Sequence, residues 1–293
     1  GPRVMRVAQH RGLQKKYLRQ RGFPVVPFVE ISSLRMLCEA LQGFKTPAVL
    51  KAAQAGCGGR RQFLIHSPLQ AEEAWAAIGR RPSVLEKWID IHRELTVVVV
   101  HSPSGEIMTY GPIQSTYHRG LLDASASPAE LPRWMTDRTI QLARDIACRL
   151  DVIGVLCVEM FLTDDYELLV NQLVPRLHDS GHLTLNAHVT SQFEQLVRAI
   201  CGLPLGPGNQ LRPAATVGLR GDRGGMVSQT GQRRSRSQEP ISTFMGSGFL
   251  SQVGGWGTSP PWPESRGRRW PARSLLGRPC GPCLSSACEP LGF

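Results

Sequence analysis

The 293-residue sequence has few aromatic residues and no long hydrophobic run. Aromatic residues make up 6% of the chain and charged residues 19%. No stretch approaches the roughly 20 continuous apolar residues that a membrane helix requires, so we expect no membrane partner. The start also lacks an initiator Met and the charged and apolar regions of a secretory signal. We therefore expect a cytoplasmic protein. We also expect that the given sequence begins in the interior of a longer chain.

Basic residues exceed acidic ones, but the excess is unevenly distributed. The formal net charge is +11. Residues 1–206 hold 23 Lys and Arg against 19 Asp and Glu, and residues 207–293 hold 11 against 4, which gives +4 and +7. This distribution does not describe a uniformly basic nucleic-acid-binding domain. We therefore expect no specific nucleic-acid partner.

The last part of the chain has a different composition. Of the last 87 residues, 25 are Gly or Pro, and such a segment cannot bury enough apolar surface to offset its chain entropy. We expect residues 223–293 to be a disordered tail. A basic interaction tail and a mis-joined end of the chain are the alternatives. Its Cys280-Gly-Pro-Cys283 stretch resembles a redox motif, but no βαβ pattern surrounds it.

Helix and strand signals alternate regularly between residues 13 and 205, and their mixture predicts an α+β domain. Helices are expected over Leu13–Arg21, Leu34–Leu41 with Ser32 as its cap, Gln70–Ile78, Trp134–Leu150 and Ser191–Ile200. Strands are expected over Val25–Val29, Ala48–Leu50, Gln62–Ile65, Ser83–Trp88, Leu95–Val100, Glu106–Ile113, Ile153–Leu162 and Glu167–Leu173.

A glycine-rich loop follows the strand that ends near Lys51. Gly56, Gly58 and Gly59 allow the backbone to approach an anion closely, and Arg60 adds a positive charge for phosphate. The spacing matches neither a P-loop nor a dinucleotide-binding fingerprint. A plain hairpin loop is therefore the alternative interpretation.

A second polar group lies on a predicted hairpin that turns near Asp164. Folding the hairpin brings Glu159 opposite residues 170–172. A carboxylate on an otherwise apolar strand needs a metal ion or a cation to neutralise it. The polar run Arg176-Leu-His-Asp-Ser-Gly-His182 follows. We interpret this region as a candidate site, with an ordinary edge Glu as the alternative.

These motifs occur in the order seen in ATP-grasp enzymes. The stretch from Val170 to His182, with Thr190–Gln195 and Gly202–Gly206, resembles N5-carboxyaminoimidazole ribonucleotide synthetases, and Ala8–Lys15 resembles their opening segment. The match covers roughly residues 4–222. The resemblance implies an ATP-grasp fold, in which two α+β subdomains clamp ATP, the first over about residues 11–88 and the second over about 90–205. It also implies purine (IMP) biosynthesis as the pathway and a homodimer as the family habit.

The resemblance implies a ligase reaction with ATP and Mg²⁺ as cofactors. Mg-ATP phosphorylates bicarbonate to carboxyphosphate, and the carboxyl group passes to the amine of aminoimidazole ribonucleotide. The residues that match cofactor-binding positions are Lys15 and Lys51 for the phosphates, Glu86, Lys87, Trp88 and Ile89 for adenine, and Glu94 for the ribose. Glu159 and Gln172 match the metal positions, Asn171 and Arg176 the catalytic ones, and Gly58, Arg60 and His182 the substrate-binding ones.

The chain also departs from the family pattern. Gln172 stands where the family has a second metal-binding Glu, and Asp179, in place of Asn, is expected to restore part of that charge. Gly58 stands in place of an Asp that meets the imidazole nucleotide, and His10 replaces another Asp.

These departures and the missing domains set the expected domain layout and the alternatives for function. Residues 1–10 are expected to be a remnant of the family's N-terminal domain or its linker, residues 11–206 the ATP-grasp domain, and residues 207–222 the start of a C-terminal domain that is otherwise absent. A remnant that only binds nucleotide and a different ATP-grasp carboxylase or ligase are the alternatives.

Overall fold

The computed structural model describes residues 2–54, 62–118, 121–218, 241–245 and 249–253. No helix in these described ranges is long and apolar enough to cross a membrane. The elements form two antiparallel sheets, one of four strands and one of eight. The functional residues lie on both of them.

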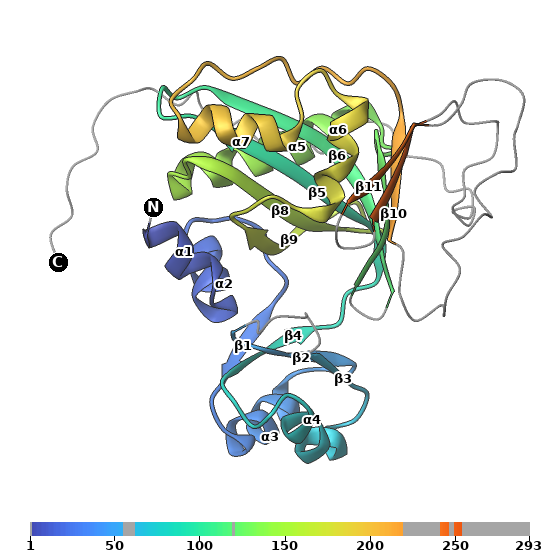
Figure 1. Ribbon diagram of the computed structural model, residues 1–293. Helices are drawn as coiled ribbons and strands as arrows, with labels where there is room; N and C mark the ends of the chain where they lie inside the picture. Colours follow the sequence, from blue (N-terminus) through green and yellow to red (C-terminus); the bar gives the residue numbers. More distant parts are fainter. Residues whose placement is uncertain (1, 55–61, 119–120, 219–240, 246–248, 254–293) are drawn as a thin grey trace, which may run out of the picture. The chain divides into compact units, whose positions relative to one another are not determined.

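The smaller sheet has the strand order β1-β4-β2-β3. Its strands are β1 (Phe28–Ile31), β2 (Ala48–Ala52), β3 (Gln62–Ile65) and β4 (Ser83–Lys87). Two helices, α3 (Leu34–Gly43) and α4 (Ala71–Ala77), lie together on one side of it (Figure 1). Leu37 and Leu41 of α3 recur at helical spacing and are buried with Leu50 and Leu85 of the sheet. The opposite side of the sheet therefore remains for the polar side chains of the site.

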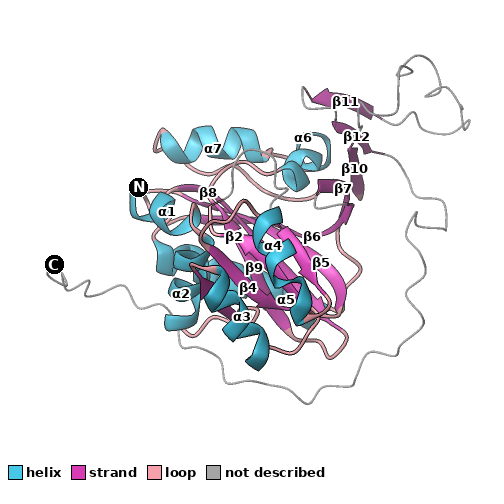
Figure 2. Ribbon diagram, turned by 90° about the horizontal axis from the view of Figure 1, so that it is seen from below, coloured by secondary structure: helices cyan, strands magenta, loops and turns pink. Residues whose placement is uncertain are grey.

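The larger sheet has the order β11-β12-β10-β7-β6-β5-β8-β9. Its strands are β5 (Ile91–His101), β6 (Ile107–His118), β7 (Leu121–Ser127), β8 (Gly154–Thr163), β9 (Leu168–Val174), β10 (Ala214–Gly218), β11 (Ile241–Met245) and β12 (Phe249–Val253). The hairpin β11–β12 continues the sheet beyond β10 and β7 (Figure 2).

Helices cover both faces of the larger sheet at β5. This explains the consecutive valines 97–100 in that strand. Val97 and Val99 pack with Ala143 and Ile146 of α5 (Arg133–Leu150). The alternate residues Val98 and Val100 belong to a second cluster. That cluster includes residues of the 3-10 helix Asp179–Leu183, of α6 (Thr184–Ala187) and of α7 (Gln192–Ile200). Because successive side chains of a strand point to opposite faces, both faces of the sheet are buried at β5.

The predicted hairpins are confirmed, including the most informative one. β5 and β6 pair antiparallel, as do β8 and β9. Glu159 of β8 lies opposite Gln172 of β9, within the range predicted from the sequence. The cap of α3 is a correction, since the Ser33 side chain, not that of Ser32, accepts the Met36 N–H. The helix begins at Leu34 as expected.

Several elements were not anticipated from the sequence. They are α1 (Pro2–Ala8), β7, β10 and the hairpin β11–β12, which lies inside the segment expected to lack regular structure. The helix α2 (Arg11–Gln20), expected in the first subdomain, contacts both sheets. Its Leu18 is buried in the cluster that contains Leu173 of β9. Its Lys15 pairs with Glu86 of β4, and its Lys16 pairs with Glu30 of β1.

Candidate functional site

Two lysines share one buried carboxylate at the centre of the site. Lys51 of β2 places its Nζ 2.8 Å from Oε2 of Glu86 of β4, and Lys15 of α2 places its Nζ 3.3 Å from Oε1. Lys15 is 1% exposed and Glu86 is 2% exposed. Burial lowers the pKa of Lys15 to about 8, although Glu86 opposes the shift. Two ammonium groups against one carboxylate leave positive charge in a desolvated place, which favours an anionic ligand.

Asn171 of β9 joins this cluster to the larger sheet. Nζ of Lys51 donates to Oδ1 of Asn171 at 3.4 Å. Nδ2 of Asn171 in turn donates to Oε2 of Glu159 at 3.3 Å. A continuous polar chain therefore runs from Lys15 through Glu86, Lys51 and Asn171 to Glu159.

Glu159 is held in place by His178 as well as by Asn171. Nε2 of His178 lies 3.0 Å from Oε1 of Glu159, and its Nδ1 lies 2.8 Å from the Ser180 hydroxyl. Burial opposes ionisation of Glu159, but the hydrogen bond and charge of His178, with the charges of Arg11 and Lys51, hold its pKa below the ordinary value. The carboxylate is therefore ionised in a buried position.

Glu94 of β5 is a second carboxylate on the same part of the sheet. Burial, and then the charge of Glu159, raise its pKa to about 7, although Lys51 opposes the shift. The pairing of β5 with β8 sets Thr96 opposite Glu159 and Glu94 opposite Phe161. Glu94 and Glu159 are thus diagonal neighbours on one face.

Three residues of this site were not assigned individually from the sequence: Arg11, Tyr117 and His178. Arg11 begins α2, donates its backbone N–H to Ala53 O at 2.7 Å, and its charge lowers the pKa of both Glu86 and Glu159. The Tyr117 hydroxyl is buried, and burial together with the charge of Glu159 raises the pKa of Tyr117. The available signal for Arg11 was its place in the segment Ala8–Lys15, which resembles the opening segment of the family. Nothing in the sequence marked Tyr117.

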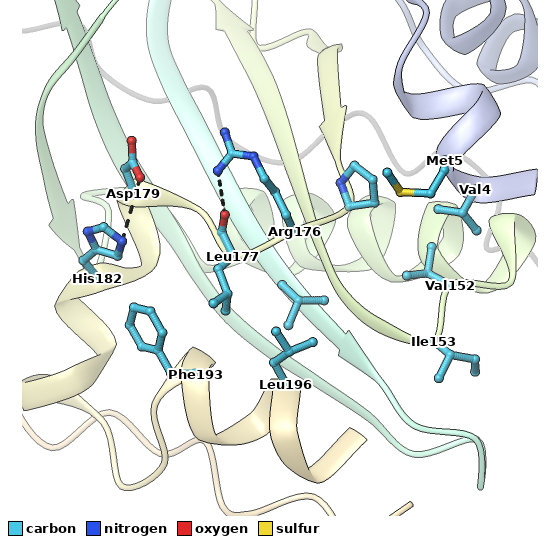
Figure 3. A pocket seen from close by; sticks show the side chains of 12 residues that line it. Val4, Met5, Val152, Ile153, Arg176, Leu177, Asp179, His182, Phe193 and Leu196 are labelled. Atoms are coloured by element: carbon cyan, nitrogen blue, oxygen red, sulfur yellow. Dashed lines mark hydrogen bonds and ion pairs between the residues drawn. The ribbon is translucent and has the colours of Figure 1, made fainter. Parts of the chain in front are cut away.

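Arg176 and His182 lie outside this polar chain and line a separate cavity of about 610 Å³. Figure 3 shows Asp179 and His182 at one end, Arg176 and Leu177 between, and Met5, Val4, Val152 and Ile153 at the other end. None of the cavity's twelve lining residues is a member of the polar chain formed by Lys15, Glu86, Lys51, Asn171 and Glu159. The two parts of the predicted site therefore have different surroundings, one charged and one largely apolar.

Asp179, which was expected to restore part of the charge that Gln172 lacks, has its described side-chain partner in His182. An oxygen of Asp179 lies 3.8 Å from Nε2 of His182. Asp179 also lines the same cavity as Arg176 and His182.

In the segment expected to contact adenine, residues 87–89 are exposed or half-buried, whereas Glu86 is buried. Lys87 is exposed, Trp88 is 40% exposed, and Ile89 is half-buried. Nε1 of Trp88 donates to Asp90 at 3.2 Å. Only Glu86 of this segment joins the polar chain, through its two lysines. The predicted substrate residues Gly58 and Arg60 lie outside the described residues.

The donor set at the predicted metal position is one carboxylate with two amides. Glu159 and Gln172 face each other across β8 and β9, and Asn171 adjoins them. In the described ranges no three His, Cys, Asp or Glu side chains come together as a metal site. Mg²⁺ in proteins is commonly held by one or two carboxylates together with substrate phosphates and water. The residues present fit Mg²⁺ at the lower limit of that range.

Known proteins resemble this chain in sequence and in fold. A family model described as the ATP-grasp domain matches residues 16–193. The chain is 40% identical over 229 residues to an N5-carboxyaminoimidazole ribonucleotide synthase of Bacillus subtilis, covering 78% of this chain and 60% of that protein. The chain therefore spans about three fifths of the length of this relative.

Two solved structures add to the comparison. The chain resembles an N5-carboxyaminoimidazole ribonucleotide synthetase in complex with ADP, with a TM-score of 0.80 and 30% identity over 87% of this chain and 69% of that one. It also resembles the Aspergillus clavatus synthase in complex with ADP and 5-aminoimidazole ribonucleotide, with a TM-score of 0.69 and 27% identity over 74% and 58%.

Proposed function

The chain belongs to the ATP-grasp family, and on that premise we propose that it is an ATP-dependent carbon–nitrogen ligase acting on 5-aminoimidazole ribonucleotide. The γ-phosphoryl group of ATP passes to bicarbonate, giving carboxyphosphate and ADP. The amine of the ribonucleotide then attacks the carboxyl carbon, and phosphate leaves. The observation that carries the proposal is the polar chain of contacts between side chains, from Lys15 to Glu159. It joins excess positive charge to an ionised carboxylate.

The cations of the site suit the polyphosphate of ATP. Phosphoryl transfer depends mainly on positioning and on neutralising the charge of the phosphate oxygens. Lys15, Lys51 and Arg11 supply three cations, and Glu86 fixes the two lysines in place. We assign residues 87–89 to the base and Glu94 to the ribose, as the family resemblance implies.

The metal position is assigned to Glu159 and Gln172. Together with the phosphates, they would hold Mg²⁺, which neutralises phosphate charge when bound. Asn171 donates to the Glu159 carboxylate and accepts from Lys51, so it couples the metal side of the site to its cationic side.

The acceptor end is assigned to the cavity that Arg176 and His182 line. A guanidinium group can bind a carboxylate or phosphate through paired hydrogen bonds. The apolar part of the cavity can accommodate an aromatic ring. Gly58 and Arg60 complete the substrate-binding assignment by resemblance. Because these substrates belong to purine biosynthesis, we place the reaction in the cytoplasm.

A second candidate function is nucleotide binding without turnover. Both oxygens of Glu159 already have protein partners, and Gln172 is uncharged. A site with one available carboxylate binds a divalent cation more weakly than one with two. If this weakness limits the reaction, Gln172→Glu raises turnover.

The test is ADP release by the full chain with Mg-ATP, bicarbonate and 5-aminoimidazole ribonucleotide, each omitted in turn. The proposal predicts ADP release that requires both bicarbonate and the ribonucleotide. Nucleotide binding without ADP release, unchanged in Gln172→Glu, would favour the second candidate. ADP release stimulated by a different amine or carboxylate acceptor would indicate another ATP-grasp ligase.

A further inference from the structure

A buried glutamine outside the site holds the backbone of the loop that carries His178. Gln192 is the first residue of α7 and is fully buried. Its Nε2 donates to the carbonyl oxygen of His178 at 2.8 Å, and its Oε1 accepts the His178 N–H at 3.3 Å. One side-chain amide thus satisfies both backbone groups of the residue that contacts Glu159.

The same helix end is tied to the loop a second time. The backbone N–H of Gln192 donates to the Thr184 hydroxyl at 2.9 Å, and that hydroxyl donates to the Gly181 carbonyl at 2.6 Å. Gly181 also packs directly on the Gln192 amide, where an added Cβ would lie 2.5 Å from Oε1. Only glycine fits there without displacing the amide, so the loop and the glutamine side chain are closely fitted.

The consequence for the site follows from the contacts of His178. Its backbone is fixed by Gln192, its Nδ1 contacts the Ser180 hydroxyl, and its Nε2 contacts the Glu159 carboxylate. We propose that Gln192 is a positioning residue of the Mg-ATP site, which orients Glu159 through His178. The inference rests on the proposed function, because it concerns the affinity for Mg-ATP.

The chain offers a matched control one turn along the same helix. Gln195 is also fully buried, and its amide binds the two backbone groups of Gly206 at 2.6 and 3.0 Å. Neither Gln195 nor Gly206 belongs to the polar chain. Replacing either glutamine by Met, which has a similar shape, removes two hydrogen bonds to backbone. The two variants therefore lose similar contacts, but only one of them affects His178.

The experiment compares the full chain with its Gln192→Met and Gln195→Met variants. Calorimetry gives the ATP affinity over a range of Mg²⁺ concentrations, thermal unfolding gives stability, and hydrogen exchange gives the protection of residues 178–183. We expect similar losses in thermal stability. Gln192→Met weakens Mg-ATP binding about 10- to 100-fold, shifts the Mg²⁺ dependence to higher concentrations and exposes residues 178–183 to exchange. Gln195→Met changes the affinity less than about twofold.

Equal Mg-ATP affinities in the two variants, with a wild type that binds, would overturn the inference and leave the proposed function standing. A folded wild type that does not bind Mg-ATP would overturn the proposed function, and the inference with it. If Gln192→Met does not fold, Thr184→Val takes its place, since it removes the hydroxyl that links Gln192 to Gly181. An affinity in Thr184→Val equal to that in Gln195→Met then counts against the inference.

Discussion

Glu86 and Glu94 show how strongly the partners of a buried carboxylate decide its charge. Burial raises the pKa of both. At Glu86 the charges of Lys51 and Lys15 outweigh burial and lower the pKa below its ordinary value. At Glu94 the nearby Glu159 adds to burial, and the pKa is raised to about 7. One carboxylate is therefore a fixed anion, and the other changes charge near neutral pH.

The raised pKa of Glu94 predicts a specific pH dependence of stability. Between about pH 4.5 and 7 the folded state holds the Glu94 proton more tightly than the unfolded state does, so this group's contribution to stability falls as pH rises. Glu94→Gln removes that contribution. We expect the variant to be more stable than the wild type by about 1–3 kcal/mol at pH 8 and equal to it below pH 4.5.

Urea unfolding of both proteins at several pH values measures this difference. Glu106→Gln is a suitable control, since Glu106 is exposed and its Oε2 accepts a hydrogen bond from the backbone of Leu205, away from the site. A difference between Glu94→Gln and wild type that does not change with pH would contradict the assignment.

At the scale of elements, the C-cap residue that follows α5 has a backbone conformation that its side chain does not favour. Asp151 has φ 53° and ψ 50°, in the left-handed region, and it lies where the negative end of the helix dipole repels a carboxylate. Glycine has no side chain to strain there. We expect Asp151→Gly to raise the free energy of unfolding by about 1 kcal/mol.

Asp151→Asn separates the two causes, because it removes the charge but keeps a side chain. We expect it to recover only the electrostatic part, a few tenths of a kcal/mol. Thermal and urea unfolding measure both variants. A decrease in stability on Asp151→Gly would show that the carboxylate makes a contact that outweighs the strain.

Elements with a strong local pattern were predicted from the sequence, and those that depend on distant pairing were not. The hairpin of β8 and β9 has a short turn and continuous apolar runs, so even the register of Glu159 was within reach. β7 has two leucines followed by small and polar residues, and it is defined by pairing with β6 and with the much later strand β10. Such long-range pairing leaves no periodic signal in either strand.

At the scale of the whole molecule, the site joins segments that are far apart in sequence. Lys51 and Asn171 meet across 120 residues, and Gln14 accepts from and donates to the backbone of Leu173 across 159. Family resemblance supplied Lys15, Lys51 and Glu159 as candidates, but not their ion pairs. Sequence alone gave no reason to expect that Glu86 binds both lysines, or that Arg176 and His182 line a different cavity. These arrangements follow from tertiary packing.

The central claim is that the polar side chains that connect Lys15 to Glu159 bind Mg-ATP. Calorimetric titration of the full protein chain with ATP in the presence of Mg²⁺ tests this claim most directly. The matched variant is Lys51→Met, with folding verified by its thermal transition. We expect saturable binding by the wild type and an affinity at least about tenfold lower in the variant, because a charged hydrogen bond to phosphate is lost. A folded wild type that gives no binding heat, or a variant that binds equally well, would contradict the account.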